Sequence, residues 1–136
     1  MVPGIVRGLH FSNISCQAES GIYLQGCEQA PMEDLSFSDV ELQLRHASAL
    51  EGGYRDMRPV ESQPGLYKSQ IAAVYAEWVN HLRLSDVSVQ WSGNRAAYYA
   101  SALEAHHLRG FRLEGFAGKA ARASAQDVVL DDVESG

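Results

Sequence analysis

The stretch Leu35-Ser36-Phe37-Ser38-Asp39-Val40 decides the fold, because its pattern occurs five times in the chain. In each copy two apolar residues alternate with variable ones, then Asn, Asp or Gly follows, and then another apolar residue. The other copies span residues 9–14, 82–87, 111–116 and 128–133. Alternation places the apolar side chains on one face of a strand. The repeat therefore predicts short strands rather than an amphipathic helix, which needs apolar spacings of three and four.

The fifth position of each copy breaks the alternation. The residues at this position are Asn13, Asp39, Asp86, Gly115 and Asp132. These residue types best tolerate left-handed backbone angles. We expect the chain to bend at each of them, so that the next apolar residue points inward from a new strand.

A second, weaker strand is expected before most copies, at residues 21–26, 71–76, 96–100 and 119–123. Successive copies begin 26, 47, 29 and 17 residues apart, which we interpret as one turn, two turns' worth of chain, one turn and one short turn. Coils of this size bury their inner faces only by stacking. We predict a single all-β domain over residues 1–136, a parallel β-helix of about five short coils with a long inserted loop at about 43–70. An antiparallel sandwich is the competing fold, but it has no reason to repeat one bend in every unit.

The charge, hydropathy and cysteine content of the chain exclude several classes of binding partner. Net charge is -6, with 17 acidic and 11 basic residues, so we expect no nucleic-acid partner. The acidity also disfavours a strongly anionic polymer unless a local basic patch overrides it. No apolar run is long enough for a bilayer, and the N-terminus lacks the features of a signal peptide, so neither a membrane partner nor an export signal is expected. Cys16 and Cys27 fit buried or half-buried thiols better than a disulfide framework or zinc site, and no cofactor is expected.

Several stretches carry a family resemblance. Residues 6–14, 21–26, 31–40, 71–87 and 108–116 resemble late coils of glycoside hydrolase family 28, the polygalacturonase-like enzymes. The resemblance implies a pectin-lyase-type parallel β-helix, right-handed as such connections generally are. It also implies a parent family that is typically secreted or periplasmic and hydrolyses pectin-type polysaccharide with carboxylates.

The chain departs from that family in its catalytic motifs. It contains no Asn-Thr-Asp, no Asp-Asp after Gly, no His-Gly and no Arg-Ile-Lys, so no catalytic residue is assigned. We predict the C-terminal β-helix portion of a polygalacturonase-like hydrolase, inactive alone. The alternatives are a non-catalytic carbohydrate-binding or structural module, and a truncated reading frame.

The first coil is expected to be open. Met1 falls in the middle of a coil, and no capping segment precedes Leu9. An uncapped end exposes apolar side chains and unpaired strand edges. The prediction is that N-terminal coils are missing, or that a partner or self-association covers this end.

The inserted loop holds the candidate substrate-binding residues, because long loops in compact domains are usually functional or disordered. Arg55, Arg58 and Lys68 could pair with sugar carboxylates, and Tyr54 and Tyr67 could stack on sugar rings. The alternative is a solvated loop with local pairs through Asp56. The ligand expected is a polysaccharide or oligosaccharide.

Other candidate groups favour structural roles. Paired carboxylates occur at Glu33-Asp34, at Glu51 with Asp56, and at Asp131-Asp132. Glycoside hydrolysis needs two such groups across one bond, but neighbours on a strand are expected to point to opposite faces. The same expectation argues against a metal at His106-His107. We expect His10 and His81 on the outer face, and Trp78 and Trp91 in packing rather than in sugar binding.

Overall fold

The computed structural model describes residues 6–18, 21–45, 54–56, 66–68, 72–91, 99–121 and 125–135, with the backbone alone for the two three-residue segments. The strands are β1 (Arg7–Ala18), β2 (Ile22–Gln25), β3 (Met32–Leu44), β4 (Tyr54–Asp56), β5 (Leu66–Lys68), β6 (Val74–Trp91), β7 (Leu103–Glu114) and β8 (Val128–Ser135). These described residues contain no helix. Accordingly, no helix long and apolar enough to cross a membrane occurs among them.

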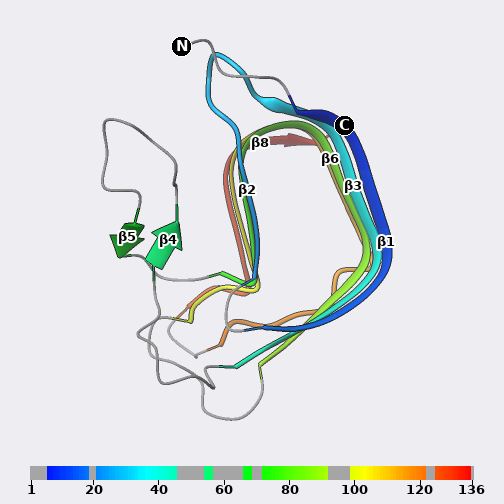
Figure 1. Ribbon diagram of the computed structural model, residues 1–136, viewed down its shortest axis with the longest axis vertical. Helices are drawn as coiled ribbons and strands as arrows, with labels where there is room; N and C mark the ends of the chain where they lie inside the picture. The colour runs from blue at the N-terminus through cyan, green and yellow to red at the C-terminus, as the bar shows by residue number, and fades with distance from the viewer. Residues whose placement is uncertain are drawn as a thin grey trace.

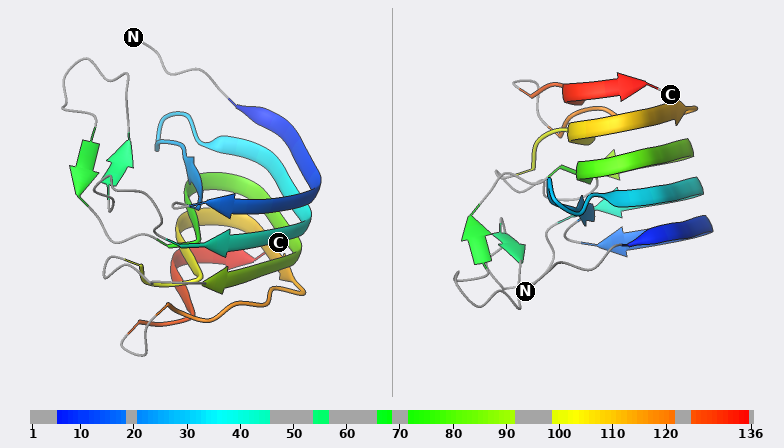
Figure 2. Two further views of the ribbon diagram at one scale, coloured as in Figure 1. Left: turned by 60° about the horizontal axis from the view of Figure 1, so that its bottom comes forward. Right: turned by 90° about the horizontal axis from the view of Figure 1, so that it is seen from above.

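The main sheet is parallel throughout. Its order is β1-β3-β6-β7-β8, and β2 pairs with the first part of β6. Parallel neighbours in chain order require the chain to return to the same side before each new strand. Figure 1 shows this return, because the long strands follow nearly the same curved path, and Figure 2 shows them side by side. The chain is therefore all-β with a mostly parallel sheet, as the repeat predicted.

The first four copies of the repeat stack in register. Leu9 pairs with Leu35 and Leu35 pairs with Leu82, while Val79 opposite Leu108 brings the fourth copy into the same alignment. The predicted bends are confirmed by positive φ angles of 57° at Asn13, 54° at Asp39, 53° at Asp86 and 63° at Gly115. Each bend restarts the alternation, which is why short polar residues and glycine stand there.

The fifth copy lies in a different row from the other four, contrary to the prediction from the repeat. Val128 pairs with Leu103, in the row of Val74 and Ile22, and not with Phe111. Asp132 does have a positive φ of 55°, but it aligns with His107 and Trp78, at a different corner of the coil. At both corners an apolar residue stands two positions before the left-handed residue and another directly after it, as in Phe37-Ser38-Asp39-Val40 and Leu130-Asp131-Asp132-Val133, so the local sequence pattern is the same for the two.

The expected strands at 96–100 and 119–123 do not hold the row of β2, and their described parts, residues 99–100 and 119–121, belong to no strand, while residues 96–98, 122 and 123 lie outside the described residues. The row that contains β2 continues into β7 at Leu103 and into β8 at Val128, which lie 25 residues apart. The short turn inferred from the spacing of 17 residues therefore does not exist. The spacing of 47 residues is a single turn, since β3 pairs directly with β6, and it carries the β4–β5 hairpin as an insertion.

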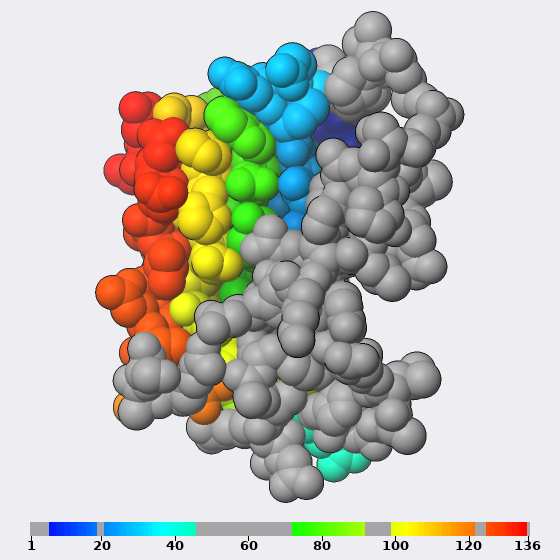
Figure 3. All heavy atoms as spheres, turned by 90° about the vertical axis from the view of Figure 1, so that its left-hand side faces the viewer, coloured from blue at the N-terminus to red at the C-terminus, as the bar shows by residue number. Residues whose placement is uncertain are grey.

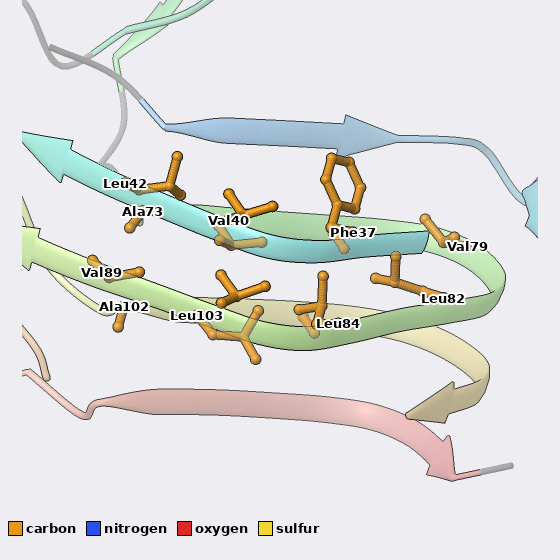
Figure 4. Packing of buried hydrophobic residues seen from close by; sticks show 14 of the residues in the cluster. Phe37, Val40, Leu42, Ala73, Val79, Leu82, Leu84, Val89, Ala102 and Leu103 are labelled. Atoms are coloured by element: carbon orange, nitrogen blue, oxygen red, sulfur yellow. The ribbon is translucent and has the colours of Figure 1, made fainter. Parts of the chain in front are cut away.

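The core consists of rows of inward side chains, mainly from β3, β6 and β7 (Figure 4), with partly buried apolar residues of β1, β2 and β8 packed against them. Leu35, Leu82 and Leu84 are at most 1% exposed. Full burial of one such side chain contributes about 1.5–3 kcal/mol. Cys16 and Cys27 are free and half-buried, as predicted. Because the inward positions are apolar, polar chemistry is confined to the outer faces and the turns.

Candidate functional site

The outer side of β2, continued by the first parts of β6, β7 and β8, gathers the densest polar and aromatic contacts of the described residues; we call it the β2 face. Figure 3 views the molecule from this side, with the strands as adjacent columns of colour. Ile22, Leu24 and their partners point inward, and the residues between them point out. The outward rows are Tyr23–Tyr75–Glu104–Val129 and Gln25–Glu77–His106–Asp131.

An aromatic stack forms one part of the β2 face. The rings of Tyr23 and Tyr75 are stacked with centroids 4.9 Å apart, and the ring of His106 lies 5.7 Å beyond Tyr75. Tyr75 is 5% exposed and Tyr23 is 37% exposed, so Tyr23 is the more exposed of the two tyrosine rings. An exposed ring held flat by a second ring is a surface on which a sugar ring can pack.

A hydrogen-bonded row runs beside this stack across the strands. The Tyr23 hydroxyl donates to Gln25 Oε1 at 2.5 Å, and Gln25 Nε2 donates to Glu77 Oε1 at 3.2 Å. Further along, His106 Nδ1 lies 3.1 Å from Asp131 Oδ2, and His106 Nε2 lies 3.5 Å from Glu104 Oε1. The row therefore presents amide, carboxylate and imidazole groups in fixed positions.

The corner next to this row holds a second network. The Trp78 and His107 rings are stacked at 4.2 Å, and His107 Nδ1 lies 2.8 Å from Asp132 Oδ2. Arg109 Nη2 donates to both carboxylate oxygens of Asp132, at 3.0 and 3.1 Å. The hydrogen bond with His107, and next that with Arg109, lowers the pKa of Asp132. The hydrogen bond to Asp132 in turn raises the pKa of Arg109.

The expectation that neighbouring polar residues would diverge is wrong at this corner. His107 and Asp132 have positive φ angles of 57° and 55°, which interrupt the alternation. Both histidines and both aspartates therefore stay on the outer surface, with the rings of His106 and His107 6.5 Å apart. Within the part of the chain that the structure describes, no three His, Cys, Asp or Glu side chains are grouped to hold a metal ion.

The carboxylates of the β2 face are engaged rather than free. Glu77 accepts from Gln25, and Glu104 and Asp131 lie against His106. Asp132 binds His107 and Arg109. Such groups hold their positions well and suit the recognition of hydroxyl groups by hydrogen bonds.

The predicted substrate-binding residues lie mainly in the β4–β5 hairpin. Its antiparallel register sets Tyr54 opposite Lys68 and Arg55 opposite Tyr67, so four of the five residues are brought together. Figure 1 shows the hairpin outside the coil, on the side of β2. Arg58 and Glu51 lie outside the described residues. The backbone thus places the hairpin outside the main sheet, on the side of the molecule that carries the β2 face.

The remaining predictions have mixed outcomes. Trp91 donates from Nε1 to the Lys119 carbonyl at 2.8 Å and packs on Tyr99, so its packing role is confirmed. His10 and His81 are exposed, as expected. The Glu33-Asp34 pair resembles the other corners, because Asp34 has a positive φ of 56° and Glu33 lies 3.8 Å from Arg7.

The β2 face was missed by the sequence interpretation. Gln25, Glu77, His106 and Asp131 are adjacent only through strand register, and they lie tens of residues apart in the chain. A correct alignment of the strands would have found them, since the residue before each of them is apolar, namely Leu24, Ala76, Ala105 and Leu130.

Comparisons with known proteins give no match: no protein-family model, no curated protein and no solved structure matches this chain.

Proposed function

We propose that the stacked strands form a right-handed parallel β-helix. Three observations support this architecture: the parallel pairing in chain order, the apolar rows and the left-handed residues that recur at the same corners. Strand connections of this kind are right-handed in nearly all proteins.

The function that we propose is polysaccharide binding, as the C-terminal coils of a polygalacturonase-like glycoside hydrolase. The observation that carries it is the row Gln25–Glu77–His106–Asp131 beside the exposed Tyr23 ring, with the β4–β5 hairpin on the same side. Rigid polar groups next to an aromatic ring match the alternation of hydroxyl groups and flat ring faces along a sugar chain. The β2 face would then form one wall of a groove.

Binding without cleavage is the activity that we assign to this chain. Glycoside hydrolysis needs one carboxyl group as an acid and a second as a base or nucleophile. On the β2 face each of Glu77, Glu104, Asp131 and Asp132 is held by a neighbouring polar side chain. Those contacts favour a binding role, and the second candidate, a purely structural module, has no comparable support.

The test combines a binding assay with a cleavage assay. The purified chain is run in native gels containing polygalacturonate, methyl-esterified pectin, an uncharged galactan or cellulose, and release of reducing ends is measured in parallel. We expect retardation by a pectin-type polymer and no release of reducing ends. Tyr23→Ala and Arg55→Gln with Lys68→Gln should weaken retardation, whereas Gln90→Ala, exposed elsewhere, should not. Migration unaffected by every polysaccharide would refute the proposal.

A further inference from the structure

A second outer face carries positive charge in this acidic protein. It lies between the corner that contains His81 and the corner that contains Asp86, and we call it the arginine face. Two outward rows cross it from β1 to β7, namely His10–Ser36–Arg83–Arg112 and Ser12–Ser38–Ser85–Glu114. The inward neighbours of these residues are apolar, so their side chains point away from the core.

Arg83 and Arg112 are direct neighbours in this face. They pair in register on β6 and β7, and both are exposed. Neighbouring strands are about 4.8 Å apart, so two like charges are held close together. Like charges opposite each other destabilise a sheet. The pair is thus a local cost that stability does not explain.

No carboxylate among the described residues relieves this repulsion. Arg7 lies 3.8 Å from Glu33, and Arg109 lies 3.0 Å from Asp132, but neither Arg83 nor Arg112 has such a contact with the described carboxylates. The corners that flank Arg112 are Gly110 and Gly115, which carry no charge. Glu114 in the second row and Asp86 at the corner are the nearest acidic residues in sequence.

We propose that the arginine face binds the carboxylate groups of a polyuronate chain, an inference that rests on the proposed polysaccharide-binding function. Two guanidinium groups can each bind a carboxylate in bidentate fashion. The serine hydroxyls of the second row can donate to and accept from sugar hydroxyls. The row from His10 to Arg112 spans three interstrand steps, about 14 Å, which accommodates several sugar units.

A polyuronate fits this face better than a nucleic acid does. Nucleic-acid binding depends on neutralising many phosphates, and the net charge of -6 opposes it. Two guanidinium groups suffice for a polymer whose carboxylates are spaced one per sugar. The arginine face is also the local basic patch that an anionic polysaccharide requires in a chain of this overall charge.

The test measures the affinity of the whole chain for polygalacturonate by calorimetry at low salt. Arg83→Gln and Arg112→Gln should each weaken binding about tenfold, the value expected for loss of a charge-assisted contact. Arg83→Lys should recover part of the loss, because it keeps the charge without the bidentate geometry. Glu114→Gln should strengthen binding by removing a repulsive carboxylate. Arg45→Gln is the matched control, since it makes the same change in net charge beyond the end of β3.

The outcomes separate this inference from the proposed function. Equal polygalacturonate affinities for Arg83→Gln, Arg112→Gln and Arg45→Gln would overturn the arginine face while leaving polysaccharide binding intact. Failure of the unmodified chain to bind any polysaccharide would overturn the proposed function itself. Binding to a short DNA duplex as tight as binding to polygalacturonate would overturn the choice of ligand class.

Discussion

The same kinds of apolar side chain are buried in the middle of the stack and exposed at its ends. Phe37 in β3 is 5% exposed, whereas Phe11, which stacks on it from β1 at 5.0 Å, is 40% exposed. Leu84 in β6 is 1% exposed, but Leu113, its partner in β7, is 37% exposed. An inward side chain is therefore buried when a described segment of the chain lies on each side of it, as β3 and the segment around Ala117 do for Val89, which is 6% exposed. Neighbouring strands, rather than residue type, decide which apolar positions stabilise the fold.

The largest effect is expected from truncating the same residue type in the two settings. Leu84→Ala should lower the free energy of unfolding by about 2–5 kcal/mol, because it leaves a cavity between packed rows. Leu9→Ala, on the exposed side of β1, should cost only about 1 kcal/mol. Urea denaturation of both variants measures the difference. Equal losses would show that β1 is as well covered as β6.

The corner residues extend the comparison to the backbone. Asp86→Ala places alanine at a φ of 53°. Alanine lacks the short polar side chain that lets aspartate adopt this left-handed conformation, so the free energy of unfolding should fall by roughly 1–2 kcal/mol. Asp86→Gly is the control and should cost less, since glycine tolerates this conformation. The same exchange at Asn13 in β1 should have a smaller effect, because fewer strands depend on that corner. Thermal unfolding of the four variants tests this order, and a larger effect at Asn13 would contradict it.

The smallest expected effect is a loss of stability at low pH, at the end of the stack where Asp132 joins β8 to β7. The pKa of Asp132 lies below the ordinary value of 3.8, owing first to His107 and then to Arg109. A lowered pKa means that the stabilising contribution is complete above about pH 4 and is lost as the pH falls through the lowered pKa. Because the contacts join β7 to β8, acid should loosen β8 before the middle strands.

Carboxyl chemical shifts and amide hydrogen exchange measured during an acid titration check this prediction. In Arg109→Gln the pKa of Asp132 should rise towards 3.8, and exchange of β8 amides should become less dependent on pH. An ordinary pKa for Asp132 in the unmodified chain would refute the importance of this network.

Much of the architecture could be predicted from local patterns. The alternation in residues 35–40 predicted strands, and the residues at positions 13, 39, 86 and 115 predicted bends that the backbone angles confirm. The prediction for Asp132 was wrong about its row, because the corner of Trp78 and His107 also contains a left-handed residue followed by an apolar one, as the corner of Asp86 does. The corners at His81 and His107 were not predicted, because bends were expected only at asparagine, aspartate and glycine, whereas histidine also adopts left-handed angles.

The candidate site was less predictable than the fold. Sequence reasoning selected the hairpin residues from the length and composition of the insertion, and register brings Tyr54, Arg55, Tyr67 and Lys68 together. It missed the β2 face and the arginine face, because each depends on residues about one coil apart in the chain. Outward positions vary between copies, so no repeat marks them.

The sequence by itself determined which positions point inward and where the chain bends, because both follow from side-chain polarity and backbone sterics within a few residues. Only the tertiary structure decided which rows align, which apolar positions are covered and which charged groups become neighbours. Arg83 beside Arg112 and His107 beside Asp132 arise from the register between coils. Register is set by the packing of the whole stack, which no single segment encodes.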